Sequence, residues 1–343
     1  MKHSKITGKT VLVTGGVGSI GSELVKKVLE YQPRQVRVID NNELRLFEAM
    51  QQYHEQKQIR FLLGDIRDRN RVMWAMQNVD IVFHTAALKH VALNEYSPFE
   101  SVKTNVLGTQ NLLEAALNHN AETFINISTD KAANPTSTMG ASKLLAERLT
   151  VGADYYKGKA KTNFANVRFG NVLKSSGSVI PIFLKQIKSG QPVTVTDKNM
   201  IRYFMTIPDA VTLILQAAAI AQGGEIFILK MPALKVIDLA QVMINELSDK
   251  KLTIKIVGKK PGEKLYEKIV TRTEASQALE LKDMYVLPLT IDYPTHSEDI
   301  VKKSYDYYLS LGGKAVPEEG VQPQQLLTPS EIRALLIRAG ILK

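Results

Sequence analysis

The chain has 343 residues, of which 44% are hydrophobic, and it carries a formal net charge of +10 without a single cysteine. This length can bury a large core, and the missing cysteines exclude disulfides, thiolate catalysis and cysteine-ligated metal sites. The positive charges occur singly or in pairs such as Lys26-Lys27, with no interleaved aromatic residues. We therefore expect no nucleic-acid partner, and a phosphorylated small molecule as the ligand.

Neither a secretory signal nor a membrane span is expected. The first nine residues are polar and basic, without an apolar core. The most apolar helical stretch, residues 211–221, is too short to cross a bilayer. These features predict a soluble, cytoplasmic protein that makes no membrane contact.

Strands and helices alternate through the first half of the chain. Apolar runs predict strands at residues 10–14, 35–39, 59–63, 81–85, 123–128 and 163–168. Helices are expected between them, from the glycine-rich loop to about residue 31 and at 43–56, 69–77, 98–119 and 139–143. This alternation predicts an α/β fold with a doubly wound parallel sheet of the Rossmann type.

After Arg168 the pattern becomes mixed and richer in glycine and proline, which indicates a smaller mixed α/β C-terminal substrate lobe. We expect a Rossmann domain at residues 1–175 and mainly the second lobe at 176–311, with some segments returning to the Rossmann core. Residues 312–343 are expected to form a tail with a short helix at 330–339.

A glycine-rich loop follows the first strand and opens the first helix, which is the context that dinucleotide binding requires. The glycines let the backbone approach a pyrophosphate, whose charge is stabilised by the helix N-terminus. The predicted cofactor contacts in this loop are Gly15, Gly18, Ser19, Ile20 and Gly21.

Asp40 ends the second strand, where a carboxylate binds ribose hydroxyls and repels a 2′-phosphate, so NAD is favoured over NADP. The nearby Arg37 and Arg45 leave NADP open as the less favoured cofactor. Further cofactor contacts are expected at the ends of the next strands, from Asn41, Asp65, Ile66, Ala86 and Ala87.

The most informative run is Ser128-Thr129-Asp130-Lys131, followed by Met139 and Lys143. A tyrosine four residues before Lys143 would share its helix face, where the ammonium lowers the phenol pKa so that the phenol can accept an alcohol's proton. Here Met139 stands at the tyrosine position, while the lysine is retained. The adjacent Asp130 and Lys131 indicate a reaction that needs both an acid and a base.

With these motifs the chain resembles the extended short-chain dehydrogenases/reductases, and among them the nucleotide-sugar 4,6-dehydratases that act on UDP-N-acetylglucosamine. The resemblance covers the chain to about residue 275. It is carried by the glycine loop, the Ser-Thr-Asp-Lys run with Met139, and the runs Gly64-Asp65-Ile66-Arg67-Asp68, Ala86-Ala87-Leu88-Lys89-His90-Val91, Arg168-Phe169-Gly170-Asn171-Val172, Gly177-Ser178-Val179-Ile180-Pro181 and Gly262-Glu263-Lys264.

The resemblance implies a lyase reaction. NAD takes hydride from C4 of the sugar, the C5 proton and C6 hydroxyl leave as water, and the hydride returns to C6. It implies that Asp130 protonates the leaving hydroxyl, Lys131 works at C5, Thr129 binds the C4 oxygen and Lys143 binds the nicotinamide ribose. The implied substrate contacts are Lys89, His90, Asn171, Ser178, Val179, Arg202 on phosphate and Glu263 on ribose. No metal is expected, and the protein is expected to form a homo-oligomer.

Several alternatives remain open. Asp40-Asn41-Asn42 is closer to family members that retain the C5 configuration, but an inverting enzyme is the alternative. A UDP-sugar 4-epimerase shares the fold and the hydride chemistry, and a non-catalytic NAD-binding sensor or scaffold would also lack the tyrosine. Met139 can serve as core filling alone. The C4 hydroxyl proton can leave through Thr129 and water or to Asp130.

Overall fold

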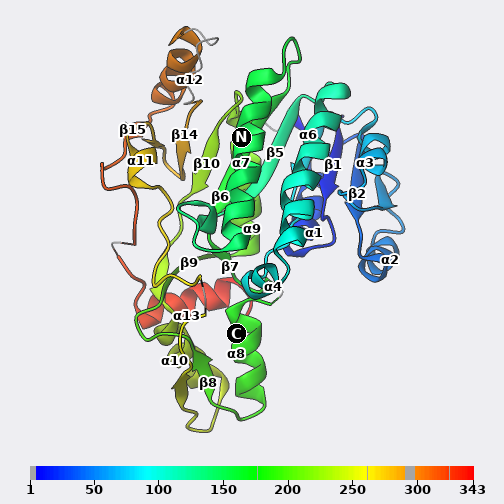
Figure 1. Cartoon of the computed structure of the whole chain (residues 1–343). Helices are drawn as coiled ribbons and strands as arrows, with labels where there is room; N and C mark the ends of the chain where they lie inside the picture. The colour runs from blue at the N-terminus through cyan, green and yellow to red at the C-terminus, as the bar shows by residue number, and fades with distance from the viewer. Residues whose placement is uncertain (1–4, 176, 261, 290–297, 324) are drawn as a thin grey trace.

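A ten-stranded sheet forms the centre of this computed structural model, which describes residues 5–175, 177–260, 262–289, 298–323 and 325–343 (Figure 1). Its order is β15-β13-β14-β10-β6-β5-β4-β1-β2-β3. The strands are β1 (Thr10–Thr14), β2 (Gln35–Asp40), β3 (Ile59–Leu63), β4 (Ile81–His84), β5 (Thr123–Thr129), β6 (Asn163–Phe169), β10 (Ile226–Leu229), β13 (Leu279–Glu280), β14 (Met284–Leu287) and β15 (Lys314–Ala315).

The sheet is parallel from β3 through β10 and antiparallel from β10 to β15. Side chains alternate between its two faces, so that Val11 and Val13 lie in one core while Leu12 lies in the other. A long parallel sheet buried on both faces confirms the predicted doubly wound Rossmann fold.

Helices cover both faces of the sheet. One face packs against α1 (Ser19–Leu29), α2 (Glu43–Gln52), α9 (Ile207–Ile220) and α12 (Glu298–Ser310), and the other against α3 (Arg69–Met76), α6 (Gly108–Asn118) and α7 (Thr138–Tyr156). The β1-loop-α1 and β5-loop-α7 connections therefore open at the same edge of the sheet, where the parallel strands end. This edge is where doubly wound proteins bind ligands.

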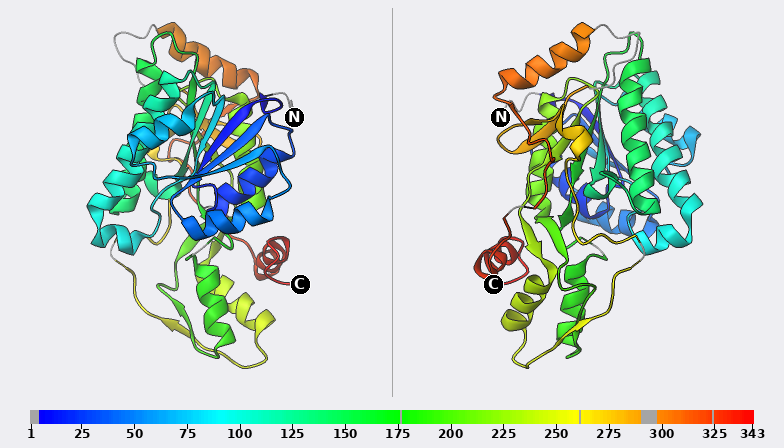
Figure 2. Two further views of the ribbon diagram at one scale, coloured as in Figure 1. Left: turned by 90° about the vertical axis from the view of Figure 1, so that its right-hand side faces the viewer. Right: turned by 60° about the vertical axis from the view of Figure 1, so that its left-hand side comes forward.

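A smaller lobe lies beyond that edge (Figure 2). It has its own buried core, formed by α8 (Val179–Lys188), β8 (Val193–Val195), α10 (Val236–Leu247), β12 (Ile254–Ile256) and α13 (Pro329–Arg338). A three-stranded sheet of β7 (Asn171–Val172), β9 (Ile201–Met205) and β11 (Ala233–Lys235) lies between this core and the large sheet.

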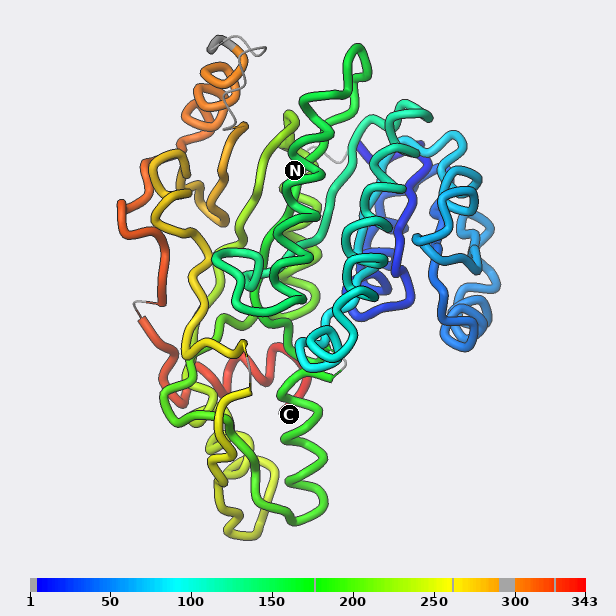
Figure 3. Tube along the Cα trace, viewed as in Figure 1, coloured from blue at the N-terminus to red at the C-terminus, as the bar shows by residue number. Residues whose placement is uncertain are grey.

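The C-terminal segment runs from the large sheet to the lobe (Figure 3). After β15 it passes along one side of the molecule to α13, whose Ile332 and Leu336 are fully buried in the lobe core. The segment 176–311 supplies α9, β10, β13, β14 and α12 to the large sheet and α11 (Arg272–Ala275) to its edge. The expected domain limits stay predictions, and residues 1–4 and 176 lie outside the described part of the chain.

The helix expected at residues 98–119 is interrupted. The structure has α5 (Pro98–Ser101), a π-helical turn at Val102–Leu107 and then α6, preceded by an unpredicted helix α4 (Val91–Tyr96). The wider turn directs Asn105 towards the loop after β4, where its amide accepts from Leu88 N (2.8 Å) and donates to Leu88 O (3.0 Å). A π turn at such a place marks a functional region more often than an ordinary helix does.

Candidate functional site

A cleft of about 790 Å³ lies between the carboxyl ends of the parallel strands and the small lobe. Every residue predicted to act in the site lines it, except Asp130. The lining includes Gly15, Gly18, Ser19, Ile20, Gly21, Asp40, Asn41, Asp65, Ile66, Ala86, Ala87, Lys89, His90, Thr129, Lys131, Met139, Lys143, Asn171, Ser178, Val179, Arg202 and Glu263. Residues far apart in sequence thus meet at one site.

The glycine-rich loop that begins at Gly15 packs closely against the backbone just after β4. Gly15 has φ +65°, and a Cβ on it would lie 2.7 Å from the Ala86 backbone, so only glycine fits there. Helix α1 begins directly after, with Gly18 as its N-cap and no acidic residue in its first turn. A helix N-terminus without a carboxylate of its own favours an external anion, so this cradle fits the pyrophosphate of a dinucleotide.

Asp40 lies at the rim of the glycine loop. Its carboxylate accepts hydrogen bonds from Val17 N (3.3 Å) and Asn42 N (3.0 Å), which hold it beside the cleft. Arg37 lies elsewhere: its guanidinium donates to Ala75 O (2.9 Å) at the end of α3, and it lines a second, separate cavity. The suggestion that Arg37 could read a 2′-phosphate is therefore wrong, whereas Arg45 lines the cleft.

Asp65 faces the same end of the cleft, 3.5 Å from Asn41 Nδ2. Burial acts to raise the pKa of its carboxyl, but hydrogen bonds from Arg67 outweigh burial and lower that pKa. Asp65 therefore stays ionised and can accept hydrogen bonds from an amine or hydroxyl donor.

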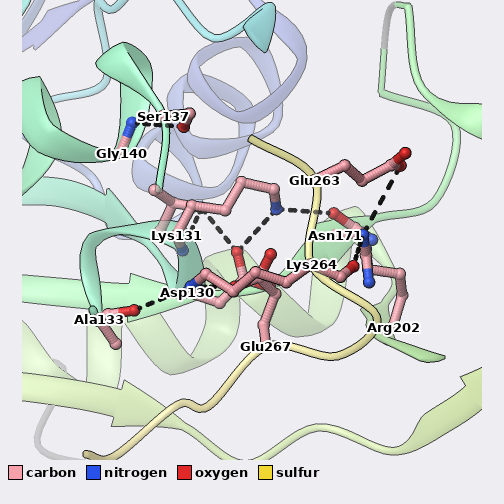
Figure 4. A network of polar contacts seen from close by, with 12 residues as sticks. Asp130, Lys131, Ala133, Ser137, Gly140, Asn171, Arg202, Glu263, Lys264 and Glu267 are labelled. Atoms are coloured by element: carbon pink, nitrogen blue, oxygen red, sulfur yellow. Dashed lines mark hydrogen bonds and ion pairs between the residues drawn. The ribbon is translucent and has the colours of Figure 1, made fainter. Parts of the chain in front are cut away.

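Thr129, Asp130 and Lys131 form one hydrogen-bonded group at the end of β5, and Figure 4 shows its Asp130 and Lys131. Asp130 Oδ1 accepts from Thr129 Oγ1 (2.9 Å) and from Lys131 Nζ (2.8 Å), and Lys131 Nζ also donates to Asn171 Oδ1 (3.3 Å). The Asp130 side chain is fully buried, and its Oδ2 has no partner among the described residues. A ligand in the cleft thus meets Thr129 and Lys131 directly, with the carboxylate behind them.

Helix α7 brings Lys143 to the same wall. Its N-cap Ser137 accepts from Gly140 N (3.2 Å), and a Cβ on Gly140 would collide with the Lys131 carbonyl, so the helix lies directly against the Asp130 turn. Lys143 Nζ donates to Ile127 O (2.6 Å). Burial lowers the pKa of Lys143 to about 8, while the Glu147 carboxylate one turn later opposes this shift. Its ammonium can therefore exchange a proton near neutral pH.

Met139 lies one turn before Lys143, 4% exposed, and lines the cleft. The methionine side chain cannot transfer a proton, because a thioether is only a weak acceptor. Any proton removed from a ligand hydroxyl beside Lys143 must therefore pass to another group, and Thr129, which donates to the buried Asp130 carboxylate, lines the same cleft.

Lys89 and His90 lie in the segment after β4 and line the cleft. Burial, and then the Arg45 charge, lowers the pKa of Lys89; burial, and then Lys89, lowers the pKa of His90. His90 packs against the loop before α8, since a Cβ on Gly177 would collide with its ring. These residues place polar groups between the two ends of the cleft.

The lobe side of the cleft presents a second helix N-terminus and a buried arginine. Helix α8 follows Ser178, whose hydroxyl makes no capping bond, and its first turn holds no acidic residue. Arg202 Nη2 donates to Lys264 O (2.8 Å) and lies 3.7 Å from Glu263 Oε1. This end can therefore hold a second anionic group, in addition to the one at α1.

Sequence reasoning missed several polar residues around the site. Lys264 and Glu267 form a pair (2.8 Å) in the cleft lining. His84 is buried beneath it between Thr14 Oγ1 (2.8 Å) and Thr109 Oγ1 (3.0 Å), and burial, then Lys143, lowers its pKa to about 3. A histidine within an apolar strand was the only sequence signal for His84.

Comparison with known proteins agrees with this geometry. The sequence profile of the polysaccharide biosynthesis protein family matches residues 11–288. The solved structure of Pen from Bacillus thuringiensis is 41% identical and superposes with a TM-score of 0.88, covering 97% of this chain and 99% of that one. The superposition confirms the predicted fold, and the UDP-N-acetylglucosamine 4,6-dehydratase among the relatives described next confirms the predicted family resemblance.

Three relatives match most of this chain, and two of them have a named activity. An uncharacterized membrane protein (MJ1061) of Methanocaldococcus jannaschii is 54% identical, covering 83% of this chain and 87% of its own. A UDP-N-acetylglucosamine 4,6-dehydratase (inverting) of Campylobacter jejuni is 38% identical, covering 85% of this chain and 86% of its own. A UDP-glucose 4-epimerase of Rickettsia conorii is also 38% identical, covering 82% of this chain and 83% of its own. Among the described residues, no helix is long and apolar enough to cross a membrane.

Proposed function

The chain belongs to the polysaccharide biosynthesis protein family, and we propose that it is a nucleotide-sugar 4,6-dehydratase acting on UDP-N-acetylglucosamine with NAD. The observation that carries this proposal is the hydrogen-bonded Thr129–Asp130–Lys131 group, in which Thr129 and Lys131 line the cleft and the Asp130 carboxylate lies behind them. Lys143 lines the same cleft, and Met139 occupies the position where a tyrosine would be the base. The product would be a UDP-4-keto-6-deoxy sugar.

The cofactor end of the cleft fits NAD. The glycine loop and the α1 N-terminus would hold the pyrophosphate, Asp40 would accept from the adenine ribose hydroxyls, and Lys143 would bind the nicotinamide ribose. When bound, NAD accepts hydride from C4 of the sugar and gives it back at C6. The Asp40 carboxylate at the rim disfavours the 2′-phosphate of NADP.

The Thr129–Asp130 hydrogen bond provides a path for the C4 hydroxyl proton. Thr129 donates to Asp130 and lies in the cleft, so its oxygen can accept the substrate proton while its own proton moves to the buried carboxylate. Asp130 then holds the proton that the departing C6 hydroxyl needs in order to leave as water. One carboxylate thus serves first as base and later as acid.

Lys131 would remove the C5 proton of the sugar and later return it. It lies beside Asp130 in the cleft wall, and Asn171 and Asp130 fix its amine from two sides. The amine form removes the C5 proton, which is acidic once C4 is a ketone, and returns it after hydride reaches C6. Return by the same amine to the same face retains the C5 configuration, which the Asp40-Asn41-Asn42 run also favours.

The competing function is 4-epimerisation. An epimerase removes and returns hydride at C4 and has no leaving hydroxyl, so it needs no acid for water loss. The buried Asp130 with its paired lysine favours elimination, although epimerase and dehydratase relatives share the same identity. A scaffold without catalysis would have no need of a buried acid beside a cleft lysine.

Incubation with UDP-N-acetylglucosamine and a trace of NAD separates these functions. We expect a 4-keto-6-deoxy product, detected by alkaline absorbance, with C5 retained in the NMR spectrum. A C4 epimer or unchanged substrate would contradict dehydration, and inverted C5 would contradict only the retaining assignment.

A further inference from the structure

Residues 262–267 form a strap along the cleft, on which Figure 4 shows Glu263, Lys264 and Glu267. On the lobe side, Arg202 donates to the carbonyl oxygens of Lys264 (2.8 Å) and Leu265 (3.1 Å). On the other side, Thr136 Oγ1 donates to Gly262 O (2.8 Å). The strap therefore touches both walls of the cleft.

Lys264 connects the strap to the large domain through its side chain. Its Nζ lies 2.8 Å from Glu267 Oε2 and donates to Ala133 O (3.3 Å). The Glu267 side chain is 4% exposed and that of Lys264 is 20% exposed, so water has little access to the pair. Because a charge removed from water needs partners, the ammonium is held between Glu267 and Ala133.

Ala133 belongs to the turn that carries Lys131. This turn begins at Asp130, whose carbonyl accepts from Ala133 N (3.2 Å), and both Asp130 and Ala133 are buried. Lys264 donates a hydrogen bond to Ala133 at the C-terminal end of the turn, and the Asp130 carboxylate accepts one from Lys131 at its N-terminal end. A displacement of Lys264 would therefore shift the turn and the amine on it.

The residue before Lys264 lies at the nucleotide end of the cleft. Glu263 lines the cleft, accepts from Lys260 N (3.1 Å) and lies 3.7 Å from the Arg202 guanidinium. A diphosphate that approaches Arg202, or a ribose that binds Glu263, acts on the segment that positions Lys264.

We propose that the Lys264–Glu267 pair couples occupation of the nucleotide end of the cleft to the position of Lys131. The inference rests on the proposed function, because that function assigns the nucleotide to the Arg202–Glu263 end. Lys264 and Glu267 are positioning residues, which direct binding energy from the nucleotide to the placement of the amine at C5.

Hydrogen exchange on the NAD-loaded full chain, with UDP as the probe, tests the coupling without turnover. UDP should slow amide exchange in residues 131–137 of the unaltered protein. In Lys264→Met, UDP should still bind but should no longer protect this segment, and Lys264→Arg should restore protection. Lys259→Met, which removes an exposed lysine just before the strap, should behave as the unaltered protein.

Kinetics give the second readout. Lys264→Met should lower kcat by about a hundredfold, as expected when a reacting group is misplaced, with KM little changed. UDP bound to the unaltered protein without protection of residues 131–137 would overturn the inference alone, as would full kcat in Lys264→Met. Failure of the unaltered protein to bind UDP would overturn the proposed function, and this inference with it.

Discussion

Replacing Lys143 with methionine should stabilise the nucleotide-free protein while abolishing its activity. Lys143 is 5% exposed, and within the described part of the chain its ammonium donates one hydrogen bond, to Ile127 O (2.6 Å). Burial lowers the pKa of its ammonium from 10.5 to about 8, which means that the folded state disfavours the charge. A methionine of similar length occupies the same space without this cost.

The size of the effect follows from that pKa. A change from 10.5 to about 8 corresponds to a destabilisation of about 3 kcal/mol, at about 1.4 kcal/mol per pH unit. Losing the hydrogen bond to Ile127 O costs about 1 kcal/mol. The net gain of about 2 kcal/mol should raise Tm by about 3 °C for a chain of this length.

The gain should depend on pH. Between about pH 8 and 10.5 the unfolded state binds more protons at Lys143 than the folded state does, so the stability of the unaltered protein rises relative to the variant. The advantage of Lys143→Met is therefore full below pH 8 and lost near pH 10.5.

Thermal unfolding at pH 7 and pH 10, followed by circular dichroism, measures this difference. Lys188→Met, at an exposed lysine near the end of α8, should show no comparable change and serves as the control. A variant less stable than the unaltered protein at pH 7, or a gap of equal size at both pH values, would refute the reasoning.

Three further substitutions test the site. Asp40→Ala should lose most preference for NAD over NADP in binding titrations, because ribose hydrogen bonds disappear and a phosphate is no longer repelled; unchanged preference would contradict this. Asp130→Asn should lower turnover by on the order of a hundredfold and slow NADH appearance in a single turnover. NADH formation at full speed would leave Asp130 as acid only. Met139→Ala should be far milder in the same assay, and a loss equal to that of Asp130→Asn would show that the thioether matters.

Local pattern was enough to predict six of the ten strands of the large sheet, β1 to β6, whereas β10, β13, β14 and β15 were not predicted. Strand β1 has the bounds expected from the apolar run before the glycine loop, and β5 extends the expected strand by one residue. Such runs are buried on both faces of a parallel sheet, so their composition alone specifies them. The residues predicted to bind the cofactor line one cleft, because a parallel sheet brings the ends of its strands to one edge.

The features that sequence did not reveal depend on contacts between distant segments. The π turn brings Asn105 to Leu88 in the loop after β4, and Lys264 of the strap reaches Ala133 across 131 positions. Arg37 is near Asp40 in sequence, but alternation along β2 and the end of α3 direct it away from the cleft. No local pattern reports that Asp130 is buried behind Thr129 and Lys131.

Transfer of deuterium within the substrate tests the central claim most directly. The enzyme would be given UDP-N-acetylglucosamine deuterated at C4, with NAD in catalytic amount, and the product examined by NMR. Internal hydride return predicts deuterium at C6 of a 4-keto-6-deoxy product over many turnovers. Deuterium returned to C4 or lost to solvent, or a stoichiometric demand for NAD, would contradict the account.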